Sequence, residues 1–433
     1  PPPRPACQSL GAMAITFAEN AAREFPDLAP TYNSLASLFT KQLWFQATEI
    51  LVDFVRDPEN TRGDNMIKLW HAYIRQAGRR MHPVKFAHLT ALCAGQLHAV
   101  NPAEAKEMME EVVGSKSVGI EHDHGRIVGT LELAALKLRE GESKACRDAV
   151  DEARPAVEAL EDADPLVQAT FHRVSAELYR VTGPAEAFHE SCMSYLARMP
   201  LESIPRATRP ALAVDLAVSA LLADNVFSFA EVLDHPIAAS IGAGPSGEAS
   251  APGAAPSSSS SSSAASAAAG AGGSTAGKVE VTEPWLADLM RAADRGDVEA
   301  VATCISSNAA GIERHAALKA GLEAFKAKAV LMALMSAAAA RPPAERSLAF
   351  AEIADTCGLD KAQVEWVVMR AVAKGLIEAT IDGVDEVVHV RYVRPRALGR
   401  DAVGKLGEAV RAWSQRTHVQ LVTVQDSARD IMS

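Results

Sequence analysis

The chain has 433 residues, of which 48% are apolar and 5% aromatic, and its formal net charge is −11 with a pI near 5.6. This length suggests two or three domains. The acidic balance argues against a nucleic-acid binder, whose affinity would depend on neutralising phosphates. The scarcity of aromatic residues and the abundance of Ala and Leu favour helix over sheet.

Residues 1–209 are predicted to form helical repeats. Pro and Gly residues separate the amphipathic stretches, for example at His82-Pro83 and Gly183-Pro184. The expected helices span 12–25, 32–56, 61–79, 84–98, 102–113, 126–140, 142–160, 166–182 and 185–199. Short helices joined by such turns are typical of a tetratricopeptide-like solenoid. No strict repeat period is present, so an irregular helical domain is the alternative.

Residues 210–398 are predicted to form a second domain that an insertion interrupts. Helices are expected over 210–224 and 228–233 before the insertion, and over 285–295, 298–306 and 314–340 after it. Gly296-Asp297 is expected to cap the helix over 298–306. The insertion, residues 242–278, consists mostly of Ala, Ser, Gly and Pro. Such a composition buries too little apolar surface to offset the ordering entropy, which predicts a disordered tract.

Residues 341–398 predict a winged helix. A short strand over 347–350 precedes a helix over 351–357 and a second helix over 361–374, which Asp360 caps and Gly375 ends. Two strands, 376–381 and 387–393, then flank a turn at Asp382-Gly383. Apolar residues alternate with polar ones along both strands, at Ile377, Ala379, Ile381, Val388, Val390 and Tyr392. This alternation indicates a hairpin with one buried face.

The winged module does not have the charge of a DNA reader. Residues 341–398 carry eight basic and nine acidic residues, a net charge of −1, and the turn from Asp382 to Glu386 is acidic. The second helix presents Val364, Trp366, Val367, Val368, Met369 and Val372, which cover more than one face. We expect this helix to be buried on two sides, within the module and against a partner. The alternative is that all of these residues fill the core of the module itself.

Residues 399–433 are predicted to form one long C-terminal helix. Its apolar positions are Val403, Leu406, Val410 and Trp413, followed by Leu421, Val424, Ala428 and Ile431. The spacing resembles a coiled-coil stripe with a phase change near Thr417, which would place the second half on a slightly rotated face. The first half is expected to pack on the parent domain and the second half on helices of other subunits. The alternative is that the helix folds back on its own domain.

No catalytic or metal site is predicted. Cys7, Cys93, Cys146, Cys192, Cys304 and Cys357 are scattered, which indicates reduced core thiols in the cytosol or nucleus. His122 and His124 lack further ligands nearby, and His189 lacks the second His of a helical zinc motif. The longest apolar run, 329–340, is too short to span a bilayer, and no secretory signal core is expected at the N-terminus. We therefore expect no enzyme activity and no cofactor.

Helical repeats that precede a winged helix and a long C-terminal helix resemble the PCI-domain subunits. This domain is shared by the 26S proteasome lid, the signalosome and translation initiation factor three. Several segments are most similar to a proteasome-lid subunit. They are residues 225–237, 284–286 with Gly296-Asp297, 348–354, 364–370, 375–390 with 393–398, and 430–433, with a looser match over 179–188. In the family the helices around His235-Pro236 and Trp285 are joined by a short turn, so the tract over 242–278 is interpreted as an insertion within one domain.

The resemblance implies a non-catalytic scaffold of the proteasome regulatory-particle lid, without a cofactor, in cytoplasm and nucleus. Implied partners are other PCI subunits, the lid metalloprotease pair and the intrinsic ubiquitin receptor, with the C-terminal helix in a multi-subunit helical bundle, and neither nucleic acid nor membrane. The alternatives are a signalosome or initiation-factor scaffold, or a nucleic-acid-binding PCI protein of mRNA export. The candidate interface residues are Trp366, Arg370, His389, Arg391, Leu406, Val410, Trp413, Leu421, Val424 and Ile431.

Overall fold

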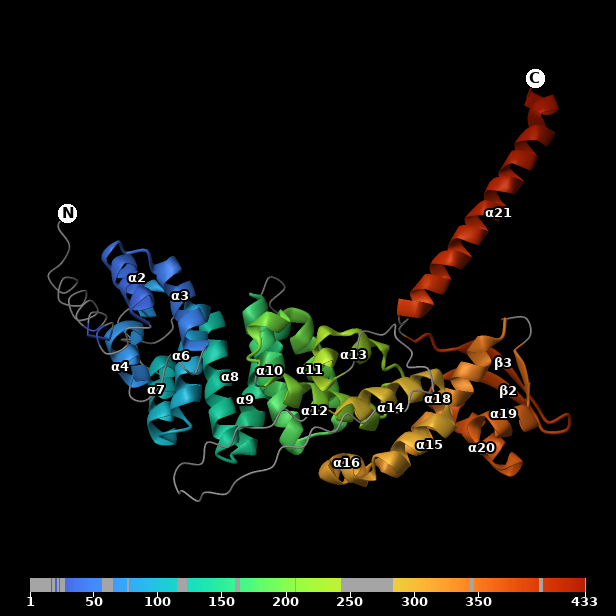
Figure 1. Ribbon diagram of the computed structural model, residues 1–433, viewed down its shortest axis with the longest axis horizontal. Coiled ribbons are helices and arrows are strands. Elements are labelled where there is room, and N and C mark those ends of the chain that lie inside the picture. Colours follow the sequence, from blue (N-terminus) through green and yellow to red (C-terminus); the bar gives the residue numbers. More distant parts are fainter. Residues whose placement is uncertain are drawn as a thin grey trace, which may run out of the picture. The chain divides into compact units, whose positions relative to one another are not determined.

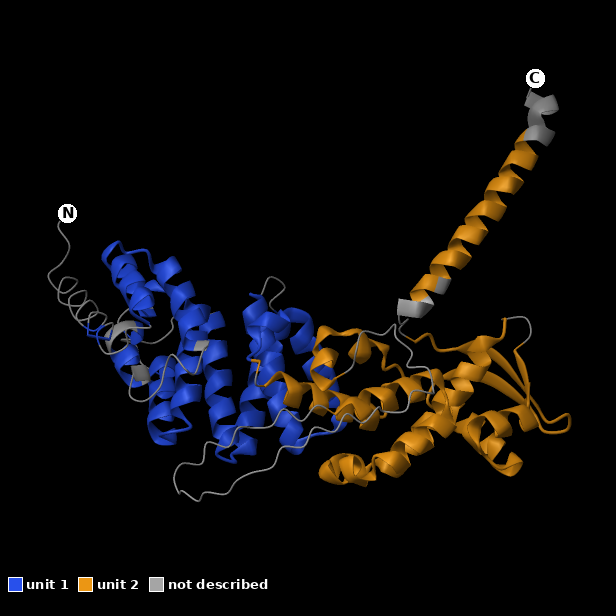
Figure 2. Ribbon diagram, viewed as in Figure 1, with its two compact units in different colours: residues 1–205 blue, residues 206–433 orange. Residues whose placement is uncertain are grey.

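The computed structural model divides the chain into two compact units, residues 1–205 (unit 1) and 206–433 (unit 2) (Figure 2). The structure describes residues 17, 20–21, 23, 28–56, 65–75, 78–114, 123–159, 164–206, 208–242, 283–342, 346–396 and 400–432. Apart from Gly242, the predicted tract over 242–278 lies outside these residues, as does most of the helix expected over 12–25. The domain boundaries at 209/210 and 398/399 stay a prediction.

The described residues of unit 1 are a succession of helices (Figure 1). The helices are α2 (Ala29–Thr40), α3 (Trp44–Arg56), α4 (Asn65–Leu69), α6 (Pro83–Leu97), α7 (Pro102–Gly114), α8 (Asp123–Arg139), α9 (Ser143–Ala159), α10 (Pro165–Thr182) and α11 (Ala185–Arg198). Short helical turns η2 (Trp70–Ile74), η3 (Gly78–Arg80) and η4 (Leu201–Ser203) complete the unit. The expected mainly α architecture is confirmed.

Two of the helices expected in unit 1 are broken. The single helix expected over 32–56 is divided into α2 and α3, because Gln42 adopts a positive φ of 58° that no helix interior accommodates. The helix expected over 61–79 consists of α4, a π-helical turn η2 and the 3₁₀ turn η3. The first break occurs at a Gln, and the π-helical turn η2 contains neither Gly nor Pro, which is why the apolar pattern alone suggested continuous helices.

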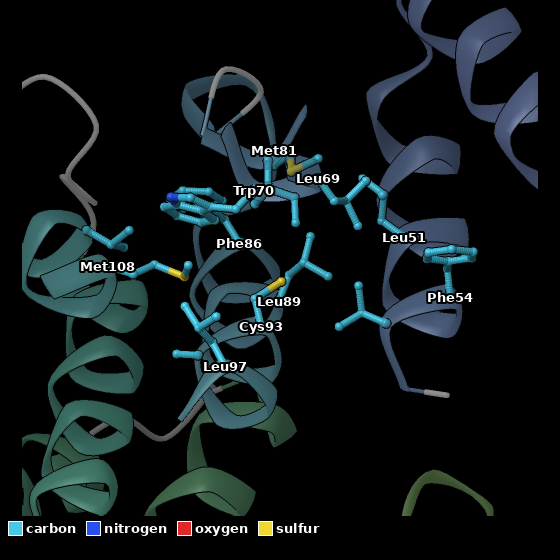
Figure 3. Close-up of a cluster of buried hydrophobic side chains, with 14 of the residues drawn as sticks. Leu51, Phe54, Leu69, Trp70, Met81, Phe86, Leu89, Cys93, Leu97 and Met108 are labelled. Carbon is cyan, nitrogen blue, oxygen red and sulfur yellow. The ribbon is translucent and has the colours of Figure 1, made fainter. Parts of the chain in front are cut away.

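Large apolar side chains from α3, α4, η2, α6 and α7 contribute to the first core of unit 1 (Figure 3). Trp70 stacks on Phe86 with ring centroids 6.2 Å apart, and both are buried. Leu51 and Leu89 are fully buried beside them. Each such side chain contributes roughly 1.5–3 kcal/mol relative to exposure. The amphipathic pattern of the sequence therefore reports a real core.

A second core joins α8, α9 and α10, with Val128, Val150 and Val174 at its centre. An ion pair crosses the same helices at its border. The guanidinium of Arg173 on α10 lies 2.5 Å from the carboxylate of Glu132 on α8 and 2.5 Å from that of Glu177 one turn away. The ion pair thus links α8 and α10 beside the apolar core that they share.

The helical part of unit 2 precedes the winged helix. It comprises α12 (Arg209–Leu222), α13 (Ala230–Asp234), η5 (Pro236–Ile241), α14 (Pro284–Arg295), α15 (Val298–Ser307), α16 (Ala309–Arg314), α17 (Ala316–Ala320) and α18 (Leu322–Ala340). The predicted cap is confirmed: Gly296 ends α14 with a φ of 80°, and Asp297 accepts a hydrogen bond of 2.9 Å from the Ala300 N–H. The stretch expected over 314–340 is two helices, α17 and α18, separated at Gly321.

The predicted winged helix is present. Its elements are β1 (Ser347–Ala349), α19 (Phe350–Cys357), α20 (Lys361–Ala373), β2 (Ile377–Asp382) and β3 (Val387–Val393), and the sheet order is β1-β3-β2 with antiparallel pairing (Figure 1). Gly375 ends α20 with a φ of 66°, as expected. Asp360 occupies the N-cap position directly before α20, as expected, but its side chain makes no capping hydrogen bond, which corrects the predicted cap.

The alternation expected along β3 fails at its end. A bulge between Glu378 and Ala379 on the β2 side makes Glu378 pair with Tyr392 and Ala379 pair with Val390, so Arg391 is the extra residue. The extra residue reverses the faces beyond it. Tyr392 is therefore exposed, whereas Val388 and Val390 are buried as expected.

Candidate partner-binding surfaces

Helix α20 divides its apolar side chains between two sides. Val364, Val367 and Val368 are buried in the module, together with Ala371. Trp366 is 60% exposed, Met369 53% and Val372 40%. The alternative that all of these residues fill the core of the module is therefore wrong. The exposed set recurs every three residues, which places it along one ridge of the helix.

Two shallow hollows flank this ridge. One, of about 350 Å³, lies between α18 and α20 and includes Leu331, Gln363, Trp366 and Arg370 in its lining. The other, of about 460 Å³, lies between α20 and β2 and is lined by Met369, Val372, Ala373, Ala379, Thr380 and Ile381. The Arg370 guanidinium lies 5.5 Å from the Trp366 ring centroid, so the cation covers one ring face. Together the hollows and the ridge form an apolar surface with one cation, which we call the α20 surface.

The candidate residues His389 and Arg391 lie on the central strand of the sheet. Because β3 lies between β1 and β2, its backbone is paired on both sides, and β2 forms an outer edge. His389 and Arg391 on β3 are exposed, so they offer side chains rather than an open edge. The His389 ring is held by its Nδ1, which lies 2.9 Å from the Ser347 hydroxyl on β1.

The turn between β2 and β3 is acidic and ordered by its own backbone. The Asp382 carboxylate accepts hydrogen bonds from the N–H groups of Val384 at 3.0 Å and Asp385 at 3.1 Å. These two bonds, that of Asp385 first, hold the pKa of Asp382 below its usual range. The turn therefore stays anionic at neutral pH, which disfavours contact with a phosphate backbone.

The predicted C-terminal helix is α21 (Arg400–Met432). Leu406, Val410, Trp413, Leu421 and Val424 are each at least half exposed, and no described side chain of the helix is buried. This contradicts both the fold-back alternative and the expectation that the first half packs on the parent domain. The side chain of Ile431 lies outside the described residues.

The stripe on α21 is not rotated in its second half. Val403 and Leu421 are 18 residues apart, and at about 3.6 residues per turn this separation is five whole turns of a continuous helix. Both halves therefore share one face, and Thr417, whose hydroxyl bonds to the Trp413 carbonyl at 3.0 Å, interrupts it with a polar group. Val419 and Val422, also exposed, lie off this face and make the second half apolar over a wider arc. The predicted phase change is wrong because it assumed the 3.5-residue period of a coiled coil, whereas α21 is a single α-helix with about 3.6 residues per turn.

The sequence interpretation underestimated two contributors to these surfaces. Met369 and Val372 were expected on α20 but not as interface candidates, and their positions three and six residues after Trp366 are the signal that could have selected them. The open edge of β2 depends on the strand order, which a pattern of alternating residues does not determine.

Other chemistry does not assemble in the described part of the chain. No group of three or more His, Cys, Asp or Glu side chains that could hold a metal ion occurs there. His122 lies outside the described residues, and His189 is buried in α11 one turn from Cys192. None of the described helices combines the length and the hydropathy that crossing a membrane requires.

Comparison with known proteins accounts for both units. Residues 31–246 match the family described as PSD13 N-terminal repeats, and residues 306–391 match the PCI domain. The chain is a PCI-domain protein with PSD13-type N-terminal repeats. The PCI match covers the winged helix almost completely, together with α18, which precedes it.

Relatives of this PCI-domain protein match it over nearly their whole length. The 26S proteasome non-ATPase regulatory subunit 13 homolog B of Arabidopsis thaliana is 25% identical over 97% of this chain and 99% of its own. The 26S proteasome regulatory subunit RPN9 of Saccharomyces cerevisiae is 24% identical over 90% of this chain and 91% of its own. A Dictyostelium discoideum relative, 26S proteasome non-ATPase regulatory subunit 13, is 21% identical over 97% of this chain. The resemblance to a PCI subunit of the proteasome, subunit nine in the regulatory-particle numbering, is confirmed.

Proposed function

We propose that this chain is a non-catalytic structural subunit of the 26S proteasome regulatory-particle lid, which supports lid assembly and thereby ubiquitin-dependent protein degradation. The observation that carries the proposal is the match of the chain to proteasome regulatory subunits over 90% or more of its length. The α20 surface and the exposed stripe of α21 supply the physical means, because both are apolar surfaces that the chain does not cover itself. Its general partners are therefore other proteasome subunits.

Each surface suits a particular kind of partner. The α20 surface and the edge of β2 suit the winged helix of a neighbouring PCI subunit, since an open edge accepts a strand and a ridge fills a hollow. The stripe of α21 suits helices of other subunits, the metalloprotease pair among them, because a long helix with one apolar face is only marginally stable alone. The intrinsic ubiquitin receptor is a further partner, and the cytoplasm and nucleus are the places of action. No catalytic role and no cofactor are assigned.

Co-purification tests this proposal. The tagged chain, expressed in cells that lack their own copy, should recover the other lid subunits in stoichiometric amounts. The double variant Trp366→Ala, Met369→Ala should recover at least about tenfold less, because it removes two exposed anchors of the kind that dominate interfaces. Lys361→Ala, at an exposed position of the same helix that lines neither hollow, is the matched control. Recovery of the signalosome or of initiation factor three in place of the lid would overturn the proposal.

The remaining rival, a nucleic-acid-binding PCI protein, is tested separately. We expect no specific complex with DNA or RNA at physiological salt, because the acidic turn of the wing and the net charge of −1 over 341–398 oppose phosphate contacts. A sequence-selective complex of sub-micromolar affinity in a gel-shift assay would favour the rival.

A further inference from the structure

The loop between α12 and α13, residues 223–229, lies at the junction of the helical part of unit 2 and its winged helix. Its residues 225–229 belong to the stretch 225–237, which carries part of the family resemblance without a role assigned to it. Phe229 is fully buried and Phe227 nearly so. Asp224 and Asn225 are exposed, but Ala223 is also buried, so the backbone groups at the buried positions need partners within the protein.

Lys328 of α18 supplies the first of them. Its side chain is buried, and its Nζ donates hydrogen bonds of 2.7 Å to the carbonyls of Ala220 and Ala223, with a longer contact of 3.4 Å to that of Leu221. These are carbonyls at the C-terminal end of α12, which have no partner within their own helix. A cation at this end of a helix is also favoured by the helix dipole. The same Nζ lies 5.1 Å from the Phe229 ring centroid and 5.7 Å from that of Phe227.

Lys374 reaches the same loop from the winged helix. It follows α20 directly, and its Nζ lies 5.7 Å from the Phe227 ring centroid and 3.3 Å from the Asp224 carboxylate. Phe227 therefore receives two cations, one from the helical part and one from the winged helix. Because a cation is attracted to the face of an aromatic ring, the loop connects the two parts energetically.

A third connection joins the segment that leaves β3. The Phe229 N–H donates to the Asp294 carboxylate on α14 at 3.3 Å. Arg396, three residues beyond β3, donates to the Asp294 carbonyl at 3.0 Å and to the Ser336 hydroxyl on α18 at 2.9 Å. The end of α20 is thus connected to the loop between α12 and α13. The segment that follows β3 is connected to α14 and α18.

We propose that residues 223–229 act as a latch that fixes the orientation of the winged helix on the helical part of unit 2, with Lys374 and Arg396 as its positioning residues. Loss of Lys374 frees the winged helix to reorient while both parts stay folded. The latch thereby sets the direction in which the α20 surface and the start of α21 face their partners. This last consequence rests on the proposed function, whereas the latch itself does not.

Hydrogen exchange of the purified full-length chain, followed by mass spectrometry, tests the latch. In Lys374→Met, peptides that cover 224–229 and 394–396 should exchange about tenfold faster. Local opening of this region costs less free energy in the variant, because the contacts of Lys374 with Asp224 and Phe227 are already absent. Peptides from the buried face of α18 should exchange as in the wild type. Lys361→Met, at the other end of α20 with its own ion pair to Glu386, is the matched control and should leave both peptides unchanged. Lys374→Arg should restore protection because it keeps the cation.

Two results would overturn the latch. One is equal exchange at 224–229 in Lys374→Met and Lys361→Met. The other is faster exchange throughout unit 2, which would make Lys374 a general stabiliser of the fold. Arg396→Gln provides the second variant, with the same two peptides as its readout. Lid recovery is measured in parallel, and Lys374→Met should reduce it several-fold at an unchanged melting temperature. If the wild type itself fails to recover the lid, the proposed function is wrong, while the exchange data still decide the latch.

Discussion

Helices α10 and α21 show two opposite uses of an apolar stripe. Helix α10 has 18 residues and buries Val167, Phe171, Val174 and Leu178 against its neighbours in unit 1. Helix α21 has 33 residues, and every apolar side chain of its described stripe is at least half exposed. Length therefore does not measure how much a helix contributes to the stability of its own chain. The first helix stabilises the fold, and the second leaves its apolar stripe exposed.

The largest expected effect comes from the buried side of this comparison. Phe86→Ala should lower the free energy of unfolding of unit 1 by about 3–5 kcal/mol, because it removes a buried ring that stacks on Trp70 and leaves a cavity. Urea denaturation followed by circular dichroism measures this loss. Phe45→Ala, which removes a ring that is 68% exposed, is the control and should cost about 0.5 kcal/mol or less. Similar losses for both variants would mean that the core is not where the structure places it.

For the exposed stripe of α21 we expect the reverse, a loss of assembly without a loss of stability. Leu421→Asp places a charge in the stripe of α21 and should leave the melting temperature unchanged while lid recovery falls at least about tenfold. Gln415→Asp places the same charge on the opposite face and should assemble normally. Deletion of residues 417–433 should act like Leu421→Asp. Wild-type recovery of the deletion variant would exclude α21 as a docking element, and unfolding of the monomer would show that α21 belongs to the core of the chain.

Unit 1 should also lose stability in mild acid. Burial, with Arg198 and Arg154 nearby, lowers the pKa of His172 to about 4 from its usual 6.5. His172 is therefore protonated in the unfolded chain below about pH 6.5, but in the folded chain only below about pH 4. Between these values the unfolded state binds more protons, so the stability of unit 1 falls as the pH decreases. His172→Gln should remove part of this loss, on the order of a few degrees of melting temperature between pH 7 and pH 5 once solvent screening is allowed for. An unchanged pH profile would show that His172 is not protected from protonation.

The smallest effect is expected for the low-complexity tract. Deletion of residues 244–277 should change the melting temperature by no more than about 1–2 °C, because each doubling of loop length costs only about 0.6 kcal/mol of closure entropy. Differential scanning calorimetry of the deletion variant measures the change. A large drop in the melting temperature would show that the tract packs on the fold and contributes to its stability.

The sequence predicted those features that depend on neighbouring residues. Gly375 and Gly296 marked helix ends because only a residue without a side chain adopts a positive φ easily, and the alternation along β2 and β3 marked the hairpin. The break between α2 and α3 at Gln42 could not be predicted, since a positive φ at a residue with a side chain is set by the packing of the two helices. The bulge at Arg391 was hidden for a related reason, because the extra residue is defined by its partner strand.

The candidate surfaces were predicted in part. The apolar excess on α20 and α21 was visible from spacing, but which side chains stay exposed depends on what the fold covers. The contacts of Lys328 join residues more than 100 positions apart, and no local pattern reports them. Nothing in the sequence distinguishes this buried lysine from the exposed Lys326 two positions before it.

The edge of β2 has a consequence for copies of the chain that have no partner. The strand has six residues, its outer side has no strand beside it in the described chain, and it carries Glu378 and Asp382. A short edge with carboxylates resists pairing with the same edge of another copy, because like charges would meet. The stripe of α21 has no such protection, and an uncovered apolar face promotes self-association. The amount of the chain made in excess over its partners therefore determines how much of it aggregates. The carboxylates of β2 slow aggregation through strand pairing, but not association through the stripe of α21.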